Sequence, residues 1–137
     1  MNIALAAHNN KKSLMQNLCI AYRPILKEHV LHGTATTARA IEEVTDLTIN
    51  RYLPGPLGGL RQIASQIISN ELDMVILFHE PGDFAFNAEF LNIMNLCDRQ
   101  NIPIATNLAS AEILLLGLSS GLLDWRDVHK KTQGDTV

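Results

Sequence analysis

The sequence predicts an α/β fold, a single domain built on a five-stranded, mainly parallel sheet with helices on both faces. Short apolar runs typical of buried strands alternate five times with stretches whose apolar residues recur at helical spacing. The fourth run, residues 74–78, is apolar throughout, which is typical of a strand covered by helices on both sides. The 137 residues suffice for one such domain, which buries roughly two thirds of its unfolded surface without a disulfide or metal.

The first half of the chain is expected to hold three strand–helix pairs. The expected strands are residues 2–7, 29–32 and 47–52. The helices that follow them are expected at residues 12–22, 38–44 and 61–70. Pro24 is expected to kink or restart the first helix, because proline lacks the N–H of a helix interior. Thr36 or Thr37 is expected to cap the second, since a hydroxyl accepts from the first N–H groups.

The second half holds two more pairs, with strands expected at residues 73–78 and 102–106 and helices at 90–97 and 109–117. The run 113–118 is apolar on every side, so we predict a helix buried all round rather than a subunit contact. Periodicity fades after residue 118. We therefore expect a domain over residues 1–118 and a divergent C-terminal segment over 119–137, partly disordered at its polar end.

Composition excludes several function classes. A net charge of −3, with only 5% aromatic residues and no basic run, argues against nucleic acid as a partner. No apolar run approaches the roughly 20 residues of a membrane span, so the cytoplasm is the expected compartment. Cys19 and Cys97 lie on apolar helix faces without CxxC spacing, which favours buried thiols. No pattern points to a metal or another cofactor.

Polar loops follow each expected strand. In a parallel sheet these loops gather at one edge, and ligands bind there at a change in strand order. We therefore expect one crevice lined by His8 with Lys12, Thr34 to Thr37, Gly55 to Gly59, His79 with Glu80, and Thr106 with Asn107.

Three of these loops favour an anion. The glycines of residues 55–59 let the backbone approach a ligand just before a helix whose first N–H groups are unpaired. Lys12 lies in the first turn of a helix, where a cation needs a neutralising anion. Thr34, Thr36 and Thr37 offer hydroxyls at another helix start. Taken one at a time, the glycine loop can be a tight turn, Lys12 a solvated lysine and the threonines plain helix caps. Three such loops on one rim of the sheet favour a phosphate site.

The chain resembles the methylglyoxal synthase family. The resemblance rests on residues 3–8 (IALAAH) followed by Lys12, residues 34–37 (TATT), residues 55–59 (GPLGG), Asp73, and residues 101–107 (NIPIATN). It implies a parallel α/β fold, a homohexamer, and a lyase that eliminates phosphate from dihydroxyacetone phosphate to give methylglyoxal. By position, the family's phosphate-binding residues match Lys12, Thr34, Thr36, Thr37 and Gly55, and its first-strand histidine matches His8.

The chain departs from the family pattern where the chemistry takes place. Pro54 replaces a phosphate-binding serine, and Leu60 replaces the aspartate that serves as general base. Across a one-residue deletion, Phe86 falls on a family histidine and Glu89 on a further aspartate. Glu80 replaces an aspartate with a longer carboxylate. The family's last strand is not recognisable, and Arg126 is only a distant candidate for its arginine.

Two functions follow, of which we favour the first. The chain is a binding module for a small phosphorylated metabolite or inorganic phosphate, and its conversion of dihydroxyacetone phosphate is weak or lost because Leu60 cannot take a proton. Regulatory domains of the same fold, as in carbamoyl phosphate synthetase, are an analogy for such a role. Alternatively, the chain is an active lyase in which Glu80, Glu89 or His79 replaces the base, although His79 and Glu80 are also typical of a solvated loop.

Overall fold

Five parallel strands form one sheet in the computed structural model, which describes residues 1–128. The sheet order is β3-β2-β1-β4-β5. Its strands are β1 (Asn2–Ala7), β2 (Val30–Gly33), β3 (Ile49–Arg51), β4 (Met74–Phe78) and β5 (Ile104–Ala105). The predicted α/β fold is confirmed.

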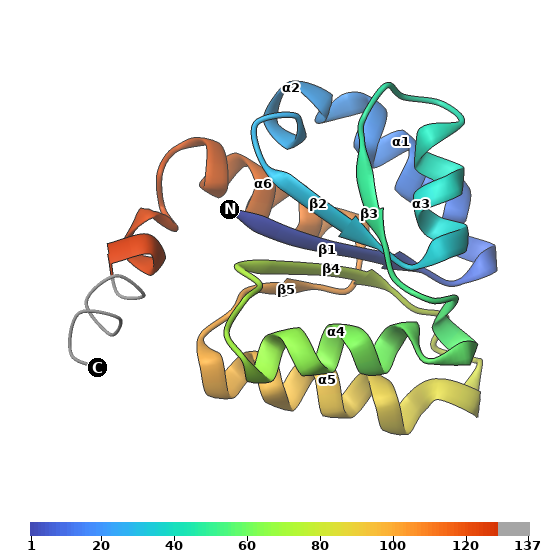
Figure 1. Cartoon of the computed structure of the whole chain (residues 1–137). Helices are drawn as coiled ribbons and strands as arrows, with labels where there is room; N and C mark the ends of the chain where they lie inside the picture. Colours follow the sequence, from blue (N-terminus) through green and yellow to red (C-terminus); the bar gives the residue numbers. More distant parts are fainter. Residues whose placement is uncertain (129–137) are drawn as a thin grey trace.

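Helices cover both faces of the sheet (Figure 1). One face carries α1 (Lys12–Ala21), α2 (Arg23–Leu26), α3 (Ala35–Glu42) and α6 (Leu108–Ser119), and the other carries α4 (Gly59–Ile68) and α5 (Asn87–Gln100). Short 3-10 turns are η1 (Asn9–Lys11), η2 (Gly55–Leu57) and η3 (Phe84–Phe86). Pro24 lies in the first turn of α2, so the predicted restart of the first helix is confirmed.

Strand alternation divides the core into two apolar clusters. Successive side chains of a strand point to opposite faces, so in β1 Ile3 and Leu5 pack toward α1, α3 and α6 while Ala4 packs toward α4 and α5. Cys19 lies in the first cluster and Cys97 in the second, both fully buried. Burial raises the pKa of each thiol to about 12. The prediction of buried thiols is confirmed.

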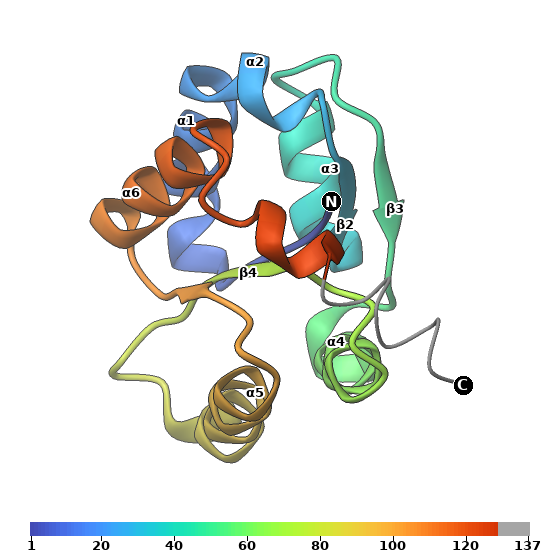
Figure 2. The same cartoon turned by 90° about the vertical axis from the view of Figure 1, so that its left-hand side faces the viewer.

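The strand order changes direction at β1. The chain runs outward from β1 to β2 and β3, and then returns to place β4 on the other side of β1. The helices after β1 and β4 lie on opposite faces, as Figure 2 shows from the side. The loops after these two neighbouring strands therefore diverge, which opens a crevice at their carboxyl ends.

Four helices begin earlier than predicted, among them α5 at Asn87 rather than at residue 90 and α6 at Leu108 rather than at residue 109. Helix α3 starts at Ala35, because Thr34 has extended backbone angles and its carbonyl accepts from the N–H of Ala38. The expected start at residue 38, with a threonine side chain as cap, is wrong. Helix α4 starts at Gly59 rather than at residue 61, because Gly58 takes a left-handed conformation (φ +117°) that ends the preceding turn.

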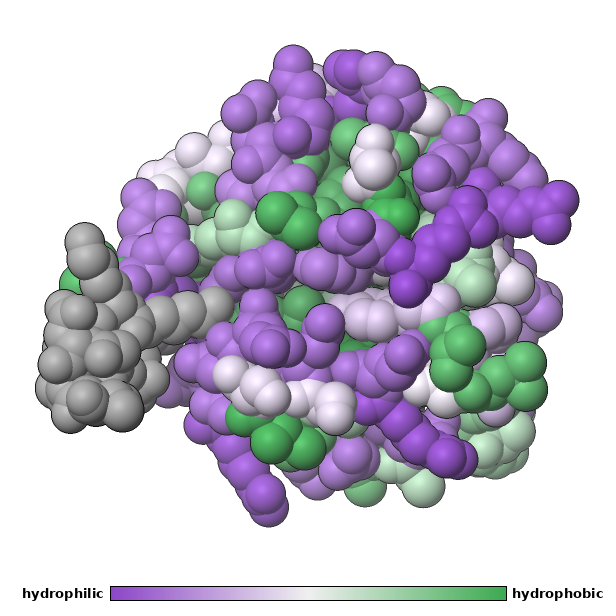
Figure 3. Space-filling view, in the orientation of Figure 1, coloured by the Kyte–Doolittle hydropathy of each residue, from purple (hydrophilic) through white to green (hydrophobic). Residues whose placement is uncertain are grey.

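Helix α6 is buried on one face only. Ala111, Leu115 and Leu118 pack into the core, whereas Ile113 and Leu116 are 70% and 53% exposed. The prediction of burial on all sides is wrong, because α6 lies at the outer edge of its layer (Figure 2). Figure 3 shows a second apolar group at the turn before α4, where Leu53 and Leu57 are exposed.

Residues 124–128 form a helical turn at the end of the described chain, and it carries Arg126. All five N–H donors of this guanidinium are used. They bond to the Asp73 carboxylate, the Asn70 side chain and the carbonyl oxygens of Leu72, Gln100 and Asn101. The polar end expected at residues 130–137 lies outside the described residues. Among residues 1–128, no helix combines the length and hydrophobicity needed to cross a bilayer.

Candidate functional site

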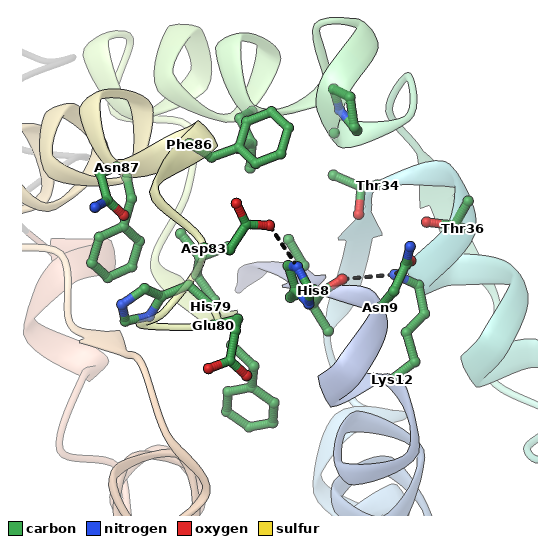
Figure 4. Close-up of a pocket in the computed structure, with 18 residues that line it drawn as sticks. His8, Asn9, Lys12, Thr34, Thr36, His79, Glu80, Asp83, Phe86 and Asn87 are labelled. Carbon is green, nitrogen blue, oxygen red and sulfur yellow. Dashed lines mark hydrogen bonds and ion pairs between the residues drawn. The ribbon is translucent and has the colours of Figure 1, made fainter.

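A cavity of about 240 Å³ lies where the loops after β1, β2, β3 and β4 meet. It is smaller than the roughly 300–1,000 Å³ of a drug-sized site, so it suits a small metabolite. Figure 4 shows Lys12, Thr34 and Thr36 on one side, Phe86, His79 and Asn87 on the other, and Asp83 between them.

The first side offers donors to an anion. The Lys12 Nζ donates to the carbonyl oxygen of Ala7 at 2.7 Å and to Oδ1 of Asn9 at 3.2 Å. Within residues 1–128 its third proton has no protein acceptor. Partial burial lowers the pKa of this ammonium, because desolvation disfavours its charge. A bound anion would restore the lost solvation. The Gly55 turn and the hydroxyls of Thr34 and Thr36 line the same side.

Thr37 supports this side from behind. It is fully buried, outside the cavity wall, and its Oγ1 accepts from the N–H of Ala7 at 3.1 Å. The same oxygen accepts from the Thr34 hydroxyl at 2.9 Å. Thr37 therefore fixes the direction of the Thr34 side chain without touching the cavity.

His8 and Asp83 face each other inside the cavity. The Nε2 of His8 lies 2.9 Å from Oδ2 of Asp83, and Nδ1 of His8 accepts from the N–H of Asn10 at 3.1 Å. A backbone N–H only donates, so Nδ1 is unprotonated and Nε2 carries the proton. In this tautomer Nε2–H donates to the carboxylate of Asp83.

Asp83 is held at both oxygens. Its Oδ1 caps η3 by accepting from the N–H of Ala85 at 3.1 Å, while Oδ2 accepts from His8. The Ala85 N–H and then His8 hold the pKa of Asp83 below its usual range. The carboxylate is therefore ionised at neutral pH and fixed in direction.

The opposite side of the cavity is apolar. Leu60, Phe86 and Phe90 line it, and the ring of His79 stacks on Phe90 with centroids 3.8 Å apart. The Nδ1 of His79 is buried and finds no hydrogen-bond partner in the part of the chain that the structure describes. Burying such a group costs free energy unless a ligand or a water satisfies it.

The chain is similar to curated methylglyoxal synthases along nearly its whole length. It is 49% identical to the enzyme of Caldicellulosiruptor saccharolyticus over 93% of this chain and 92% of that one. For the Clostridioides difficile enzyme the identity is 47% over 95% and 96%, and for that of Thermoanaerobacter sp. it is 45% over 96% and 100%. No protein-family model matches.

The chain belongs to the methylglyoxal synthase family. A crystal structure of methylglyoxal synthase from Elizabethkingia anophelis superposes with a TM-score of 0.75 at 34% identity, covering 83% of this chain and 76% of that one. The relatives thus support both the resemblance seen in the motifs and the fold.

Most of the residues matched to the methylglyoxal synthase family lie together. The cavity gathers His8, Lys12, Thr34, Thr36, Gly55, Leu60, His79, Glu80 and Phe86. Glu80 is turned toward the rim, with Oε2 4.0 Å from the Lys11 Nζ and Oε1 3.4 Å from the Gly82 N–H. Glu89 lies outside this wall and pairs with Arg61 at 3.4 Å.

Three other predicted positions lie elsewhere. Thr106 and Asn107 do not line the cavity, and Asn107 instead caps α6 by accepting from the N–H of Ser110. The expectation that these two residues share the crevice is wrong. Arg126 lies in the buried network with Asp73, outside the cavity wall.

The sequence reasoning passed over Asp83, Asn9 and Asn87, which all line the cavity. Asp83 had a local signal: an aspartate before a short helical segment is a typical cap. Its pairing with His8 spans 75 residues and had no signal in the sequence.

Proposed function

We propose that this chain binds a small phosphorylated ligand of the triose phosphate type, and that its conversion of dihydroxyacetone phosphate to methylglyoxal is weak or lost. One observation carries the proposal: Lys12, Thr34, Thr36 and Gly55 converge on one side of a small cavity, while Leu60 lines the other. The four residues of the first side suit phosphate oxygens. Leu60 places a methyl-terminated side chain where the family resemblance expects a carboxylate.

The binding half of the proposal rests on charge and backbone donors. Lys12 supplies a cation, and the start of α3 supplies N–H groups that have no partner within the helix. Charge-assisted hydrogen bonds of this kind contribute roughly 1.5–3 kcal/mol each. Pro54 offers neither a hydroxyl nor an N–H, so we expect weaker binding than in a relative with serine there.

The weakened chemistry rests on the missing base. Removing a proton from carbon beside a carbonyl needs a positioned acceptor, and such an acceptor typically contributes 10²–10⁴-fold in rate. Leucine has none. Phe86 likewise places a hydrocarbon ring where the resemblance expects an imidazole, which removes a donor for the developing negative charge.

Two measurements made together test the proposal. Calorimetry with inorganic phosphate is expected to show binding at millimolar concentration or below. Release of methylglyoxal and phosphate from dihydroxyacetone phosphate is expected to be at least about 100-fold slower than for the Clostridioides difficile enzyme assayed in parallel. Absence of phosphate binding would refute the proposed site, and turnover equal to that relative would refute the weakened chemistry.

The second candidate is an active lyase with a substitute base. The placement of Glu80 in the cavity wall favours it, whereas Glu89 pairs with Arg61 outside the wall. The discriminating variant is Glu80→Gln. Loss of activity with unchanged phosphate affinity would support Glu80 as that base.

A further inference from the structure

We propose that Asp83 is the proton acceptor of this cavity, taking the proton from the ligand carbon beside the carbonyl, and that His8 is its positioning residue. The inference rests on the proposed function and adds which group carries the remaining chemistry. Asp83 occupies no position that the family resemblance assigns to catalysis.

Placement first distinguishes Asp83 from other carboxylates. Among the acidic residues of the described chain, Asp83 and Glu80 line the cavity. Glu80 lies toward the rim near Lys11, whereas Asp83 lies between the anion-binding side and the aromatic side (Figure 4). A ligand whose phosphate is near Lys12 and whose carbon chain extends toward Phe86 therefore passes Asp83.

Two hydrogen-bond donors fix the orientation of the Asp83 carboxylate. The Ala85 N–H fixes one carboxylate oxygen at 3.1 Å and the His8 Nε2–H fixes the other at 2.9 Å. Each oxygen keeps a lone pair that can receive a proton. The Asn10 N–H in turn fixes the His8 ring in the tautomer that donates. This chain of bonds holds the base in one direction, as general base catalysis requires.

Phosphate elimination from dihydroxyacetone phosphate needs no reagent besides the ligand, Asp83 and water. Asp83 takes a proton from the hydroxymethyl carbon of dihydroxyacetone phosphate, the C–H electron pair forms a C=C bond, and the carbonyl oxygen takes the charge. The enediolate then loses phosphate: the C–O bond breaks toward phosphate, the terminal hydroxyl becomes an aldehyde, and its proton leaves on the phosphate. Protonated Asp83 returns its proton to the enolate oxygen. The resulting enol tautomerises to methylglyoxal in water.

The same contacts predict a slow reaction. The Ala85 and His8 donors that orient Asp83 also depress its pKa, which makes it a weaker base than a carboxylate without those donors. Proton-transfer rates follow basicity. The turnover expected from Asp83 is therefore low rather than absent.

Proton abstraction can be measured separately from phosphate loss. In D₂O, proton NMR is expected to show exchange of the hydroxymethyl hydrogen of dihydroxyacetone phosphate with wild-type protein. Asp83→Asn is expected to slow exchange and methylglyoxal release at least about 100-fold, with phosphate affinity unchanged or tighter because a negative charge is removed. Asp98→Asn, the same change at an exposed site on α5, is the matched control.

A second variant at position 83 distinguishes loss of the carboxylate from misfolding of the loop. Asp83→Ser keeps an oxygen that can cap η3 at Ala85 but removes the carboxylate, so the same loss of exchange is expected. His8→Gln keeps an amide N–H for Asp83 and is expected to retain kcat within about fivefold, whereas His8→Ala is expected to lose at least tenfold in kcat with a smaller change in KM.

The outcomes separate this inference from the proposed function. Exchange at the wild-type rate in Asp83→Asn would overturn the inference. Glu80→Gln protein that loses exchange while Asp83→Asn keeps it would overturn the inference as well. Wild-type protein that binds phosphate yet shows neither exchange nor methylglyoxal would also overturn it and leave the binding function standing. Exchange without phosphate binding would overturn the binding function alone.

Discussion

Arg126 and Asp73 form an ion pair in the interior, with Nε and Oδ1 3.2 Å apart and both side chains only 2% exposed. The carboxylate also accepts from the N–H of Asn2 at 2.8 Å. The guanidinium reaches the ends of α4 and α5 through Asn70 and Asn101, both in the left-handed conformation. One side chain thus joins the last described turn to both helices on one face of the sheet.

We expect Arg126→Ala to lower the free energy of unfolding by about 3–5 kcal/mol, because it removes the cation that faces a buried carboxylate. Urea titration monitored by circular dichroism measures the change. Arg39→Ala is the control, since Arg39 is exposed and its pair with Glu43 is worth about 0.3–0.5 kcal/mol. A loss below about 1 kcal/mol for Arg126→Ala would contradict the importance of this pair.

Lys12→Ala is expected to weaken inorganic phosphate binding by about 1.5–3 kcal/mol, the scale of one charge-assisted hydrogen bond. Calorimetry measures it directly. Lys11→Ala is the matched control, because Lys11 is the same residue type one position earlier and lies outside the cavity wall. Equal losses in the two variants would show that general positive charge, rather than the Lys12 position, governs binding.

Acid is expected to destabilise the protein below about pH 6.5. Burial lowers the pKa of His29 and His32 from 6.5, and the N-terminal ammonium adds to the effect at His29. Between the lowered and the ordinary value the unfolded chain binds more protons, so stability rises with pH and is lost as pH falls.

Urea midpoints measured from pH 8 to pH 5 test this expectation. His32→Gln is expected to flatten the slope, since it removes one titrating ring. Asp46 and Asp83 do not interfere, because a carboxyl whose pKa is lowered from 3.8 by folding changes stability only below about pH 5. Midpoints that stay constant across the range would contradict the expectation.

Leu60→Asp is expected to raise turnover of dihydroxyacetone phosphate at least about tenfold by adding a carboxylate to the cavity wall. Phe86 and Pro54 remain, so the gain is expected to be partial. An acidic residue in the first turn of α4 also suits the helix dipole. Leu60→Asn is the uncharged control, and an equal gain there would argue against a restored base.

The family resemblance implies a homohexamer, so light scattering is expected to give about six times the chain mass of 15.1 kDa. The exposed apolar face of α6 is a candidate contact, and Leu116→Glu is expected to lower the measured mass. Leu91→Glu, at an exposed apolar position on α5, is the control. A single-chain mass across micromolar concentrations would contradict the assembly.

The fold was predictable because its signals are local and repeated. Five apolar runs and the helical spacing between them are visible without knowledge of contacts. The helix starts were less predictable, because the backbone carbonyl of Thr34 and the positive φ of Gly58 decide them. Strand order was not predicted, so the place of β5 beside β4, on the side of β4 away from β1, was not foreseen.

The site was predictable as a group of loops but not as a set of side-chain directions. Thr36 and Thr37 are neighbours in sequence, yet a helix turns about 100° per residue, so one lines the cavity and the other lies behind it. Glu89 lies on α5 at a position that pairs with α4. Asp83 is defined as a site residue by His8, which only the folded chain brings near.

The burial of Cys19 and Cys97 has a consequence for chemical durability. These are the only two cysteines in the sequence, and with pKa values of about 12 almost none of either thiol is ionised at neutral pH. The thiolate is the form that reacts with electrophiles. Neither cysteine would therefore add to the carbonyl group of a dicarbonyl such as methylglyoxal, and iodoacetamide is expected to leave the thiols of the folded chain unlabelled.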